Sequence, residues 1–322
     1  MSDAAVPSRA PAPAPAPPIQ IGPPEIDALA TPFRPFRYEV PDGLGIAGRI
    51  YGELDDAPLP LLCLPGLTRN GRDFEPVAAF LAGRRPVVTL DFRGRGQSDR
   101  DPYPDRYSPL IEAQDVIVGL AALGLPQVAL LGTSRGGIVG MILAALRPWL
   151  LKAAILNDVG AVLERDGLLR IKDYVGVGPA PADWTEAEAA VARLGGGQFP
   201  DLDRAAMARM ARRLYREADG RPVPDYDPAL SRGLDELTPE SPLPDLWAPF
   251  EALKDVPVLV IRGALSDILS EMTVTAMAAR HAGLEAHTVP RQGHAPLLED
   301  EATLARIGAF LDRAEHRGTS AG

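Results

Sequence analysis

The sequence has little of the chemistry that cysteine and histidine bring, because its 322 residues include one cysteine and four histidines. A single cysteine excludes an internal disulfide, and it also excludes a metal site built from several cysteines. Cys63 lies in the apolar run Leu61–Leu64, so we expect a buried thiol rather than a nucleophile. A catalytic base, if there is one, has few candidates.

Long apolar runs and an excess of positive charge are also missing. No run reaches the roughly 18 apolar residues of a membrane-spanning helix, and the N-terminus lacks the basic and apolar regions of a secretory signal. Lys and Arg number 33 and Asp and Glu 43, which gives a formal net charge of −10. This balance argues against nucleic acid or an anionic membrane as the main partner. We expect a cytoplasmic protein that acts on a small molecule, and the sequence leaves its oligomeric state open.

Composition and length indicate how the chain is organised. Apolar residues make up 46% of it, enough for a substantial core. Residues 1–24 are rich in alanine and proline and are predicted to be a disordered tail. Residues 25–160 and 251–322 are predicted to form one α/β core, and residues 161–250 are predicted to be a helical cap inserted into it.

The core prediction comes from strand-like and helix-like segments that alternate after a hairpin signal at Pro41-Asp42-Gly43. Apolar strands that alternate with helices predict an α/β fold, a mostly parallel, doubly wound sheet of about eight strands with the antiparallel hairpin at one edge. The strand-like segments are 36–40, 44–51, 59–64, 86–91, 128–133, 151–156, 256–262 and 285–289, and the helix-like segments are 74–81, 110–123, 135–146, 271–281 and 301–315.

The alternation stops between Gly160 and Phe250. This segment contains charged amphipathic stretches at 184–194 and 201–218 but no strand-like run. Loops of this length without structure of their own are rare. We therefore expect helices that cap the core.

One pentapeptide carries the strongest sign of chemistry. Gly132-Thr133-Ser134-Arg135-Gly136 lies between a predicted buried strand and a predicted helix. A serine on such a sharp turn is held in a strained conformation with its hydroxyl exposed, and the glycines let strand and helix approach closely. The pattern predicts Ser134 as a nucleophile if a base, an acid and an oxyanion hole lie nearby.

His294 is the predicted base. It stands in the loop between the last predicted strand and the final helix. In a doubly wound sheet, the loops at the carboxyl ends of the strands form the site. The other histidines are predicted at a helix end, inside a strand and in the C-terminal tail; they are His281, His287 and His316.

Two acids compete to orient His294, because Asp158 and Asp267 both directly follow predicted strands. Asp267 comes one strand–helix unit before His294, which places their two loops side by side. We predict Asp267 as the acid that fixes the imidazole tautomer and stabilises the imidazolium. Asp158 is predicted to anchor the start of the cap or to line the pocket.

Acyl transfer also requires donors for a developing oxyanion. The backbone N–H of Arg135, directly after the serine, is one predicted donor. The other is the N–H of Leu67, in the loop after a strand, where Gly66 allows a tight turn. The Arg135 side chain is expected to pair with an acid of the protein rather than with a substrate carboxylate.

On these motifs, the chain resembles the α/β-hydrolase fold superfamily over roughly residues 35–315. The order serine, acid, histidine is that of the superfamily, and residues 91–99 (DFRGRGQSD) resemble its D-x-R-G-x-G-x-S turn. The resemblance implies a serine hydrolase with a helical cap that needs no metal and no cofactor. The chain departs from it at Pro65, where many relatives have histidine, and at Arg135, where methionine or glutamine is common.

The predicted reaction is hydrolysis of a carboxylic ester, or of a related acyl bond, through an acyl-enzyme on a Ser134–Asp267–His294 triad. The resemblance leaves open a C–C bond hydrolase of the meta-cleavage type, a lactonase, an iminopeptidase and a cofactor-free haloperoxidase on the same triad. A slow-turnover ligand receptor is the alternative from another class. Epoxide hydrolases and haloalkane dehalogenases have aspartate at the elbow, so the serine disfavours them. The candidate pocket residues are Arg69, Asn70, Asp158 and Trp247.

Overall fold

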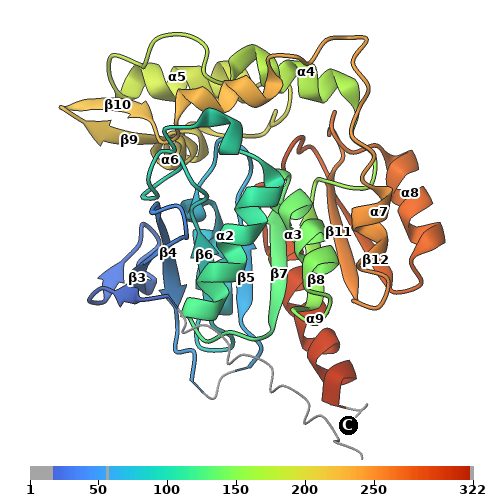
Figure 1. Cartoon of the computed structure of the whole chain (residues 1–322). Coiled ribbons are helices and arrows are strands. Elements are labelled where there is room, and N and C mark those ends of the chain that lie inside the picture. The colour runs from blue at the N-terminus through green and yellow to red at the C-terminus, as the bar shows by residue number, and fades with distance from the viewer. Residues whose placement is uncertain (1–16, 56–57, 320–322) are drawn as a thin grey trace, which may run out of the picture.

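The computed structural model describes residues 17–55 and 58–319, and a ten-stranded sheet runs through the centre of this part of the chain (Figure 1). The three strands at one edge pair antiparallel, and the following strands are parallel to one another. In spatial order the strands are β1 (Ile19–Ile21), β3 (Pro32–Glu39), β4 (Gly45–Tyr51), β6 (Val87–Leu90), β5 (Leu61–Leu64), β7 (Val128–Thr133), β8 (Leu151–Asn157), β11 (Val258–Gly263) and β12 (Leu284–Val289), and β2 (Glu25–Ile26) pairs with β3.

Helices cover both faces of the sheet, which confirms the predicted doubly wound α/β fold. The first face is covered by α2 (Pro109–Ala122), α3 (Arg135–Leu146), α7 (Trp247–Glu251) and α8 (Glu271–Arg280). The opposite face is covered by α1 (Glu75–Leu81) and α9 (Glu301–Thr319). The strand segments are mostly apolar for this reason, because a strand covered on both faces buries nearly all of its side chains.

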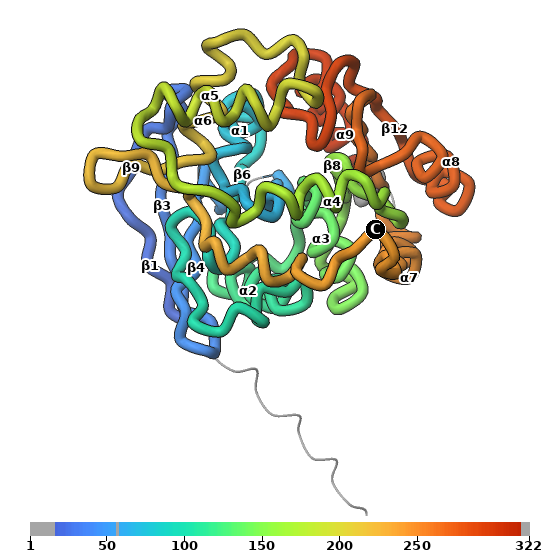
Figure 2. Tube along the Cα trace, turned by 90° about the horizontal axis from the view of Figure 1, so that it is seen from above, coloured from blue at the N-terminus to red at the C-terminus, as the bar shows by residue number. Residues whose placement is uncertain are grey.

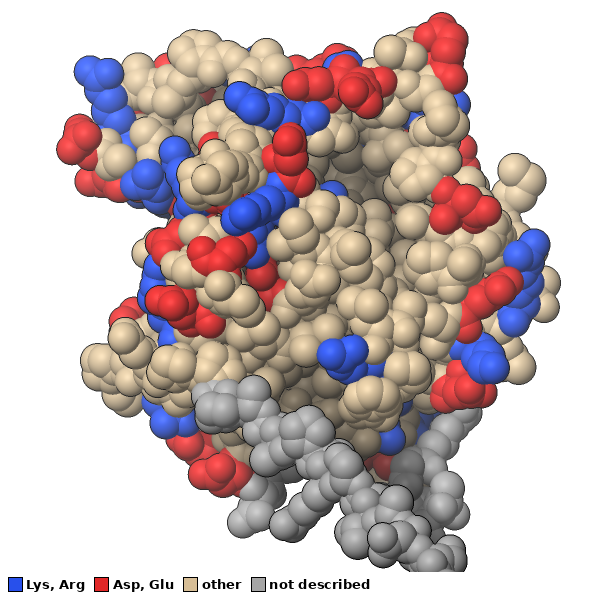
Figure 3. Space-filling model, in the orientation of Figure 1, with Lys and Arg blue, Asp and Glu red and all other residues tan. Residues whose placement is uncertain are grey.

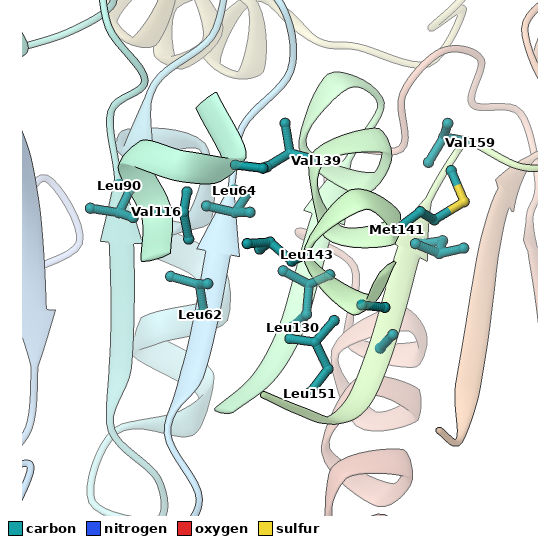
Figure 4. Packing of buried hydrophobic residues seen from close by; sticks show 14 of the residues in the cluster. Leu62, Leu64, Leu90, Val116, Leu130, Val139, Met141, Leu143, Leu151 and Val159 are labelled. Atoms are coloured by element: carbon teal, nitrogen blue, oxygen red, sulfur yellow. The ribbon is translucent and has the colours of Figure 1, made fainter. Parts of the chain in front are cut away.

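Strand β5 illustrates how one segment supplies both cores. Leu62 and Leu64 join the cluster under α2 and α3, whereas Leu61 and Cys63 join the cluster under α1 and α9. Successive side chains of a strand point to opposite faces, so the run divides evenly between the two layers. Figure 4 shows the first cluster, in which Leu62 lies among side chains of the sheet and of α2 and α3. The predicted burial of the Cys63 thiol is confirmed.

The N-terminal part of the sheet corrects the predicted tail. Residues 1–24 are expected to be disordered, but Ile19–Ile21 form β1, which pairs antiparallel with β3 from Ile19 opposite Tyr38 to Ile21 opposite Phe36. The open edge of β3 offers backbone donors and acceptors that an extended segment can satisfy. Together, β1 and β2 make the sheet larger than the eight strands expected. Residues 1–16, to which the tail prediction also applies, lie outside the described residues.

The insertion between β8 and β11 lies over the carboxyl ends of the parallel strands (Figures 1 and 2). Besides α7, which packs on the core, its α-helices are α4 (Arg165–Tyr174), α5 (Trp184–Gly195) and α6 (Arg204–Leu214). Helices α5 and α6 pack on each other through Ala187, Val191 and Ala211. The expectation that this segment has no strand is wrong, because β9 (Tyr215–Ala218) and β10 (Arg221–Pro224) form a hairpin outside the main sheet. The division into a core and a cap at 161–250 stays a prediction.

No helix in the described part of the chain is long and apolar enough to cross a bilayer. On the face shown in Figure 3, acidic and basic side chains are interspersed over both the insertion and the core. This face therefore has none of the concentrated positive charge that would attract a polyanion.

We predict that Gly136→Ala destabilises the protein although alanine favours helices. A Cβ on Gly136 would overlap the backbone carbonyl of Leu64 in β5, because α3 passes directly against that strand. Overpacking of this kind costs about 1–3 kcal/mol, more than the roughly 1 kcal/mol that alanine gains over glycine in a helix. Chemical denaturation measures the difference.

Gly233→Ala is the matched control, since a Cβ there meets no atom within 4 Å. Its unfolding free energy is expected to stay at or above that of the wild type. A Gly136→Ala protein that is as stable as this control would contradict the close approach of α3 to β5.

Candidate active site

Ser134 occupies the predicted sharp turn between β7 and α3. Its backbone has φ 50° and ψ −113°, a conformation that non-glycine residues rarely adopt. The turn is fixed from both sides, because the Ser134 N–H donates to the Asn157 carbonyl at 2.9 Å and the Gly137 N–H donates to the Ser134 carbonyl at 2.9 Å. A Cβ on Gly132 would lie 2.6 Å from the Gly136 carbonyl group, so the tight crossing of strand and helix depends on glycine.

The structure brings His294 to Ser134. The imidazole Nε2 lies 2.9 Å from the Ser134 hydroxyl oxygen, and Nδ1 lies 2.8 Å from Oδ2 of Asp158. The His294 backbone N–H donates to the side-chain oxygen of Gln198 at 2.7 Å. With 8% of its side chain exposed, the histidine lies at the floor of a pocket and is largely shielded from water.

Asp158 is the acid at this histidine, and its carboxylate is buried, with none of its side chain exposed. Besides the imidazole, it accepts hydrogen bonds from the Gly263 N–H at 2.8 Å and from the Ser266 hydroxyl at 2.6 Å. An ionised carboxylate only accepts, so Nδ1 of His294 carries a proton and, in the neutral ring, Nε2 accepts from the Ser134 hydroxyl. The three side chains form one chain of hydrogen bonds from the carboxylate to the hydroxyl.

The expectation that Asp267 orients His294 is wrong. Asp267 binds the guanidinium of Arg170 in α4 through both carboxylate oxygens, at 2.5 and 2.8 Å. Burial alone would raise the pKa of Asp267, but the hydrogen bond and charge of Arg170 outweigh it and hold that pKa below its ordinary value. The turn after β11 directs Ser266 toward Asp158 and Asp267 toward the insertion.

Ser134 and His294 open onto a cavity of about 150 Å³ between the core and the insertion. One part of its wall is charged or polar, with Arg69, Arg170, Gln198, Arg213 and Glu299. The remainder is mainly apolar and includes Phe74, Ile171, Leu194, Phe199, Met210 and Leu214. The pocket therefore suits a ligand with a hydrocarbon part and a polar or charged group.

Of the four predicted pocket residues, Arg69 alone lines this cavity. Asp158 lies behind His294. Asn70 is buried elsewhere, where it caps the turn Gly71–Phe74 and donates to Asp225. The pocket prediction for Trp247 is also wrong, because its ring packs edge-on against Phe250. Asn70 and Trp247 have structural roles at these contacts.

The two predicted oxyanion donors flank Ser134. Leu67 lines the pocket, and Arg135 is the first residue of α3, where a helix leaves its N–H without a partner. In the described part of the chain, neither amide donates a hydrogen bond to another residue. The Arg135 side chain pairs with the buried carboxylate of Glu112 at 2.7 Å, so its predicted structural partner is present.

Two polar residues of the insertion escaped the sequence prediction. Arg170 binds the Asp267 carboxylate, which therefore does not pair with His294. Gln198 accepts from the His294 backbone N–H and donates to Asp267 at 3.3 Å. Both lie in the insertion, outside the alternating strands and helices from which the positions of the other site residues were predicted. Their sequence spacing therefore contained no signal that they reach the site.

Comparison with known proteins identifies the family. The sequence profile of the alpha/beta hydrolase family matches residues 61–307, which include the strands and loops that hold Ser134, Asp158 and His294. The chain belongs to this family. It is a hydrolase, and in the described residues no group of three or more His, Cys, Asp or Glu side chains is placed to hold a metal ion.

Three relatives cover most of the chain. A 3-hydroxybutyrate-oligomer hydrolase from Cupriavidus necator is 35% identical over 84% of this chain and 94% of its own length. A 2-(acetamidomethylene)succinate hydrolase from Mesorhizobium japonicum is 28% identical over 81% and 90%. The crystal structure of an alpha/beta hydrolase from Novosphingobium aromaticivorans has a TM-score of 0.82 and 40% identity, over 87% of this chain and 98% of the other. The uncovered part of this chain is smaller than the insertion, so the likeness extends into the insertion as well as the core.

Proposed function

We propose that this hydrolase cleaves carboxylic esters through an acyl-enzyme on Ser134. One observation carries the proposal, the chain of hydrogen bonds from Asp158 through His294 to the Ser134 hydroxyl at the floor of a pocket. A nucleophile within reach of a base, itself oriented by an acid, is the arrangement that activates serine. The proposed catalytic triad is therefore Ser134, His294 and Asp158, with Asp158 in the place predicted for Asp267.

Acylation starts when the Ser134 oxygen attacks the ester carbonyl carbon while Nε2 of His294 takes the hydroxyl proton. The imidazolium that forms is stabilised by the buried Asp158 carboxylate. Collapse of the tetrahedral intermediate breaks the bond to the alcohol oxygen, and His294 returns the proton to this leaving group. The acyl group remains on Ser134.

The Leu67 and Arg135 amides bind the negative oxygen of the intermediate. Both lie beside Ser134 and have no other acceptor among the described residues. Removing one such donor from a serine hydrolase typically costs about 2.7–4 kcal/mol of transition-state stabilisation. The two amides together are expected to stabilise the transition state for acyl transfer.

Deacylation repeats the same chemistry with water. His294 takes a proton from the water as its oxygen attacks the acyl carbon, and the same proton returns to Ser134 when the acid leaves. Both half-reactions use the same side chains and amides, with the ester as the reactant in the first and water in the second.

We further propose that the substrate is a hydroxy-acid ester with a free carboxylate. The relative from Cupriavidus necator acts on 3-hydroxybutyrate oligomers, and oligomers of a hydroxy acid have ester links and a terminal carboxylate. Arg69 lines the pocket and binds Asp73 through Nε and Nη2, at 2.7 and 2.6 Å. Among the described residues Nη1 of Arg69 donates to no acceptor, so it can bind a substrate carboxylate, as guanidinium groups commonly do.

Variants of the three residues test the mechanism. Ser134→Ala is expected to abolish ester turnover, and Asp158→Asn is expected to lower kcat by about 10⁴-fold, because an amide favours the wrong imidazole tautomer. Asp267→Asn is the matched control and is expected to lose far less activity. Steady-state kinetics with a p-nitrophenyl ester measures all three. Full turnover by Ser134→Ala, or equal losses in the two aspartate variants, would contradict the proposal.

A comparison of two esters tests the substrate class. The 3-hydroxybutyrate dimer with a free carboxylate is expected to have a kcat/KM roughly tenfold or more above that of its methyl ester, since a hydrogen bond to a charged group contributes about 1.5–3 kcal/mol. The double variant Arg69→Gln with Asp73→Asn removes the arginine without leaving an unpaired acid. This variant is expected to lose the preference, and if it keeps the preference, Arg69 does not bind the carboxylate.

A further inference from the structure

We propose that Arg95, together with Glu112, is a positioning residue that aligns the two amides of the oxyanion hole. This inference rests on the proposed function, in which the Leu67 and Arg135 amides bind the oxyanion. Neither Arg95 nor Glu112 lines the cavity. They would act through the residues that they hold.

Arg95 fixes the Leu67 side of the hole. Its side chain is fully buried in the turn after β6, and Nε donates to the Leu67 carbonyl at 2.8 Å. A second hydrogen bond, from Nη1 to the Arg93 carbonyl at 2.7 Å, holds the guanidinium in place. The Leu67 N–H shares its peptide plane with the Gly66 carbonyl, which accepts from the Arg69 N–H at 3.2 Å. Arg95 holds the next peptide plane, so the loop is fixed on both sides of the Leu67 Cα.

Glu112 links Arg95 to Arg135, the residue that carries the other proposed oxyanion donor. Its carboxylate in α2 is fully buried, with Oε1 2.8 Å from Nη1 of Arg95 and Oε2 2.7 Å from Nε of Arg135. Arg135 also donates from Nη2 to the Tyr107 carbonyl at 2.8 Å. A buried chain of charges thus runs from the Leu67 carbonyl through Arg95 and Glu112 to Arg135, and it ties the two donor residues to each other.

The charges of this chain make a purely stabilising role a poor explanation. Burial alone would raise the pKa of Glu112, but the charges of Arg135 and Arg95 keep that pKa below its ordinary value. Buried ion pairs often stabilise a protein no better than apolar side chains of the same volume, because the charges lose their hydration. Two guanidinium groups around one carboxylate also leave one net positive charge in this buried chain.

Arg93 supplies a matched control two residues away. It is buried as deeply as Arg95, with 1% of its side chain exposed, and pairs with Asp42, Asp101 and Asp115. None of these acids lines the pocket or contacts Leu67 or Arg135. Arg93→Lys changes this side chain but keeps the backbone carbonyl that accepts from Arg95. The substitution therefore disturbs a buried ionic cluster and leaves the side-chain contacts to Leu67 and Arg135 in place.

The test compares Arg95→Lys with Arg93→Lys in the full-length enzyme, since lysine keeps the charge but cannot make the several directed bonds of a guanidinium. Arg95→Lys is expected to lower kcat about 10–100-fold with little change in KM, somewhat less than complete removal of one oxyanion donor. Affinity for an alkyl boronic acid, which forms a tetrahedral adduct on serine, is expected to fall by a similar factor. Arg93→Lys is expected to lower the denaturation midpoint and to leave kcat and boronate affinity near those of the wild type.

Glu112→Gln keeps the shape of the side chain and gives a second variant if Arg95→Lys does not fold. It is expected to weaken boronate binding more than substrate binding. The inference is overturned if the Arg95 and Glu112 variants lose stability but keep kcat and boronate affinity, as Arg93→Lys does. Turnover that survives Ser134→Ala would instead refute the proposed function. This outcome is distinct from failure of the positioning role, because it is observed in a protein with Arg95 unchanged.

Discussion

The buried carboxylate of Asp158 is the interaction on which the arrangement of the site depends. It stands at the end of β8 and accepts hydrogen bonds from the loop after β11, through Gly263 and Ser266, and from the loop after β12, through His294. A buried carboxylate is costly unless donors surround it, so these loops are held where they satisfy it. With the loops fixed, the imidazole has one orientation, in which Nε2 meets the Ser134 hydroxyl.

The polar and charged residues around this centre form two groups, one in the insertion and one in the core. Arg170 and Gln198 come from the insertion and contact Asp267 and the His294 backbone, so the insertion and the histidine loop support each other. Arg95 and Glu112 belong to the core and contact Leu67 and Arg135, the two proposed oxyanion donors. Polar contacts from the insertion and from the core thus support residues around Ser134 and His294, and such supporting contacts keep a site close to its working geometry.

The sequence predicts the parts of the fold that follow from local pattern. The apolar segments become the parallel strands, the pentapeptide around Ser134 becomes the strand–helix turn, and the loop with His294 lies where a doubly wound sheet places it. The choice between Asp158 and Asp267 goes wrong because both follow strands, and their directions are decided by contacts with Ser266 and Arg170, far away in the chain. Residues 19–21 enter the sheet for a similar reason, since the free edge of β3 outweighs their local composition.

A crystal structure of the enzyme after reaction with a short alkyl fluorophosphonate tests most directly whether Ser134 is the nucleophile and whether the Leu67 and Arg135 amides bind the oxyanion. One label per chain is expected, bonded to the Ser134 oxygen. A phosphonyl oxygen is expected about 2.7–3.1 Å from the amide nitrogens of both Leu67 and Arg135. His294 should remain hydrogen-bonded to Asp158 in that adduct. A label on another residue would show that Ser134 is not the nucleophile, and an oxygen directed away from the two amides would show that they do not form the oxyanion hole.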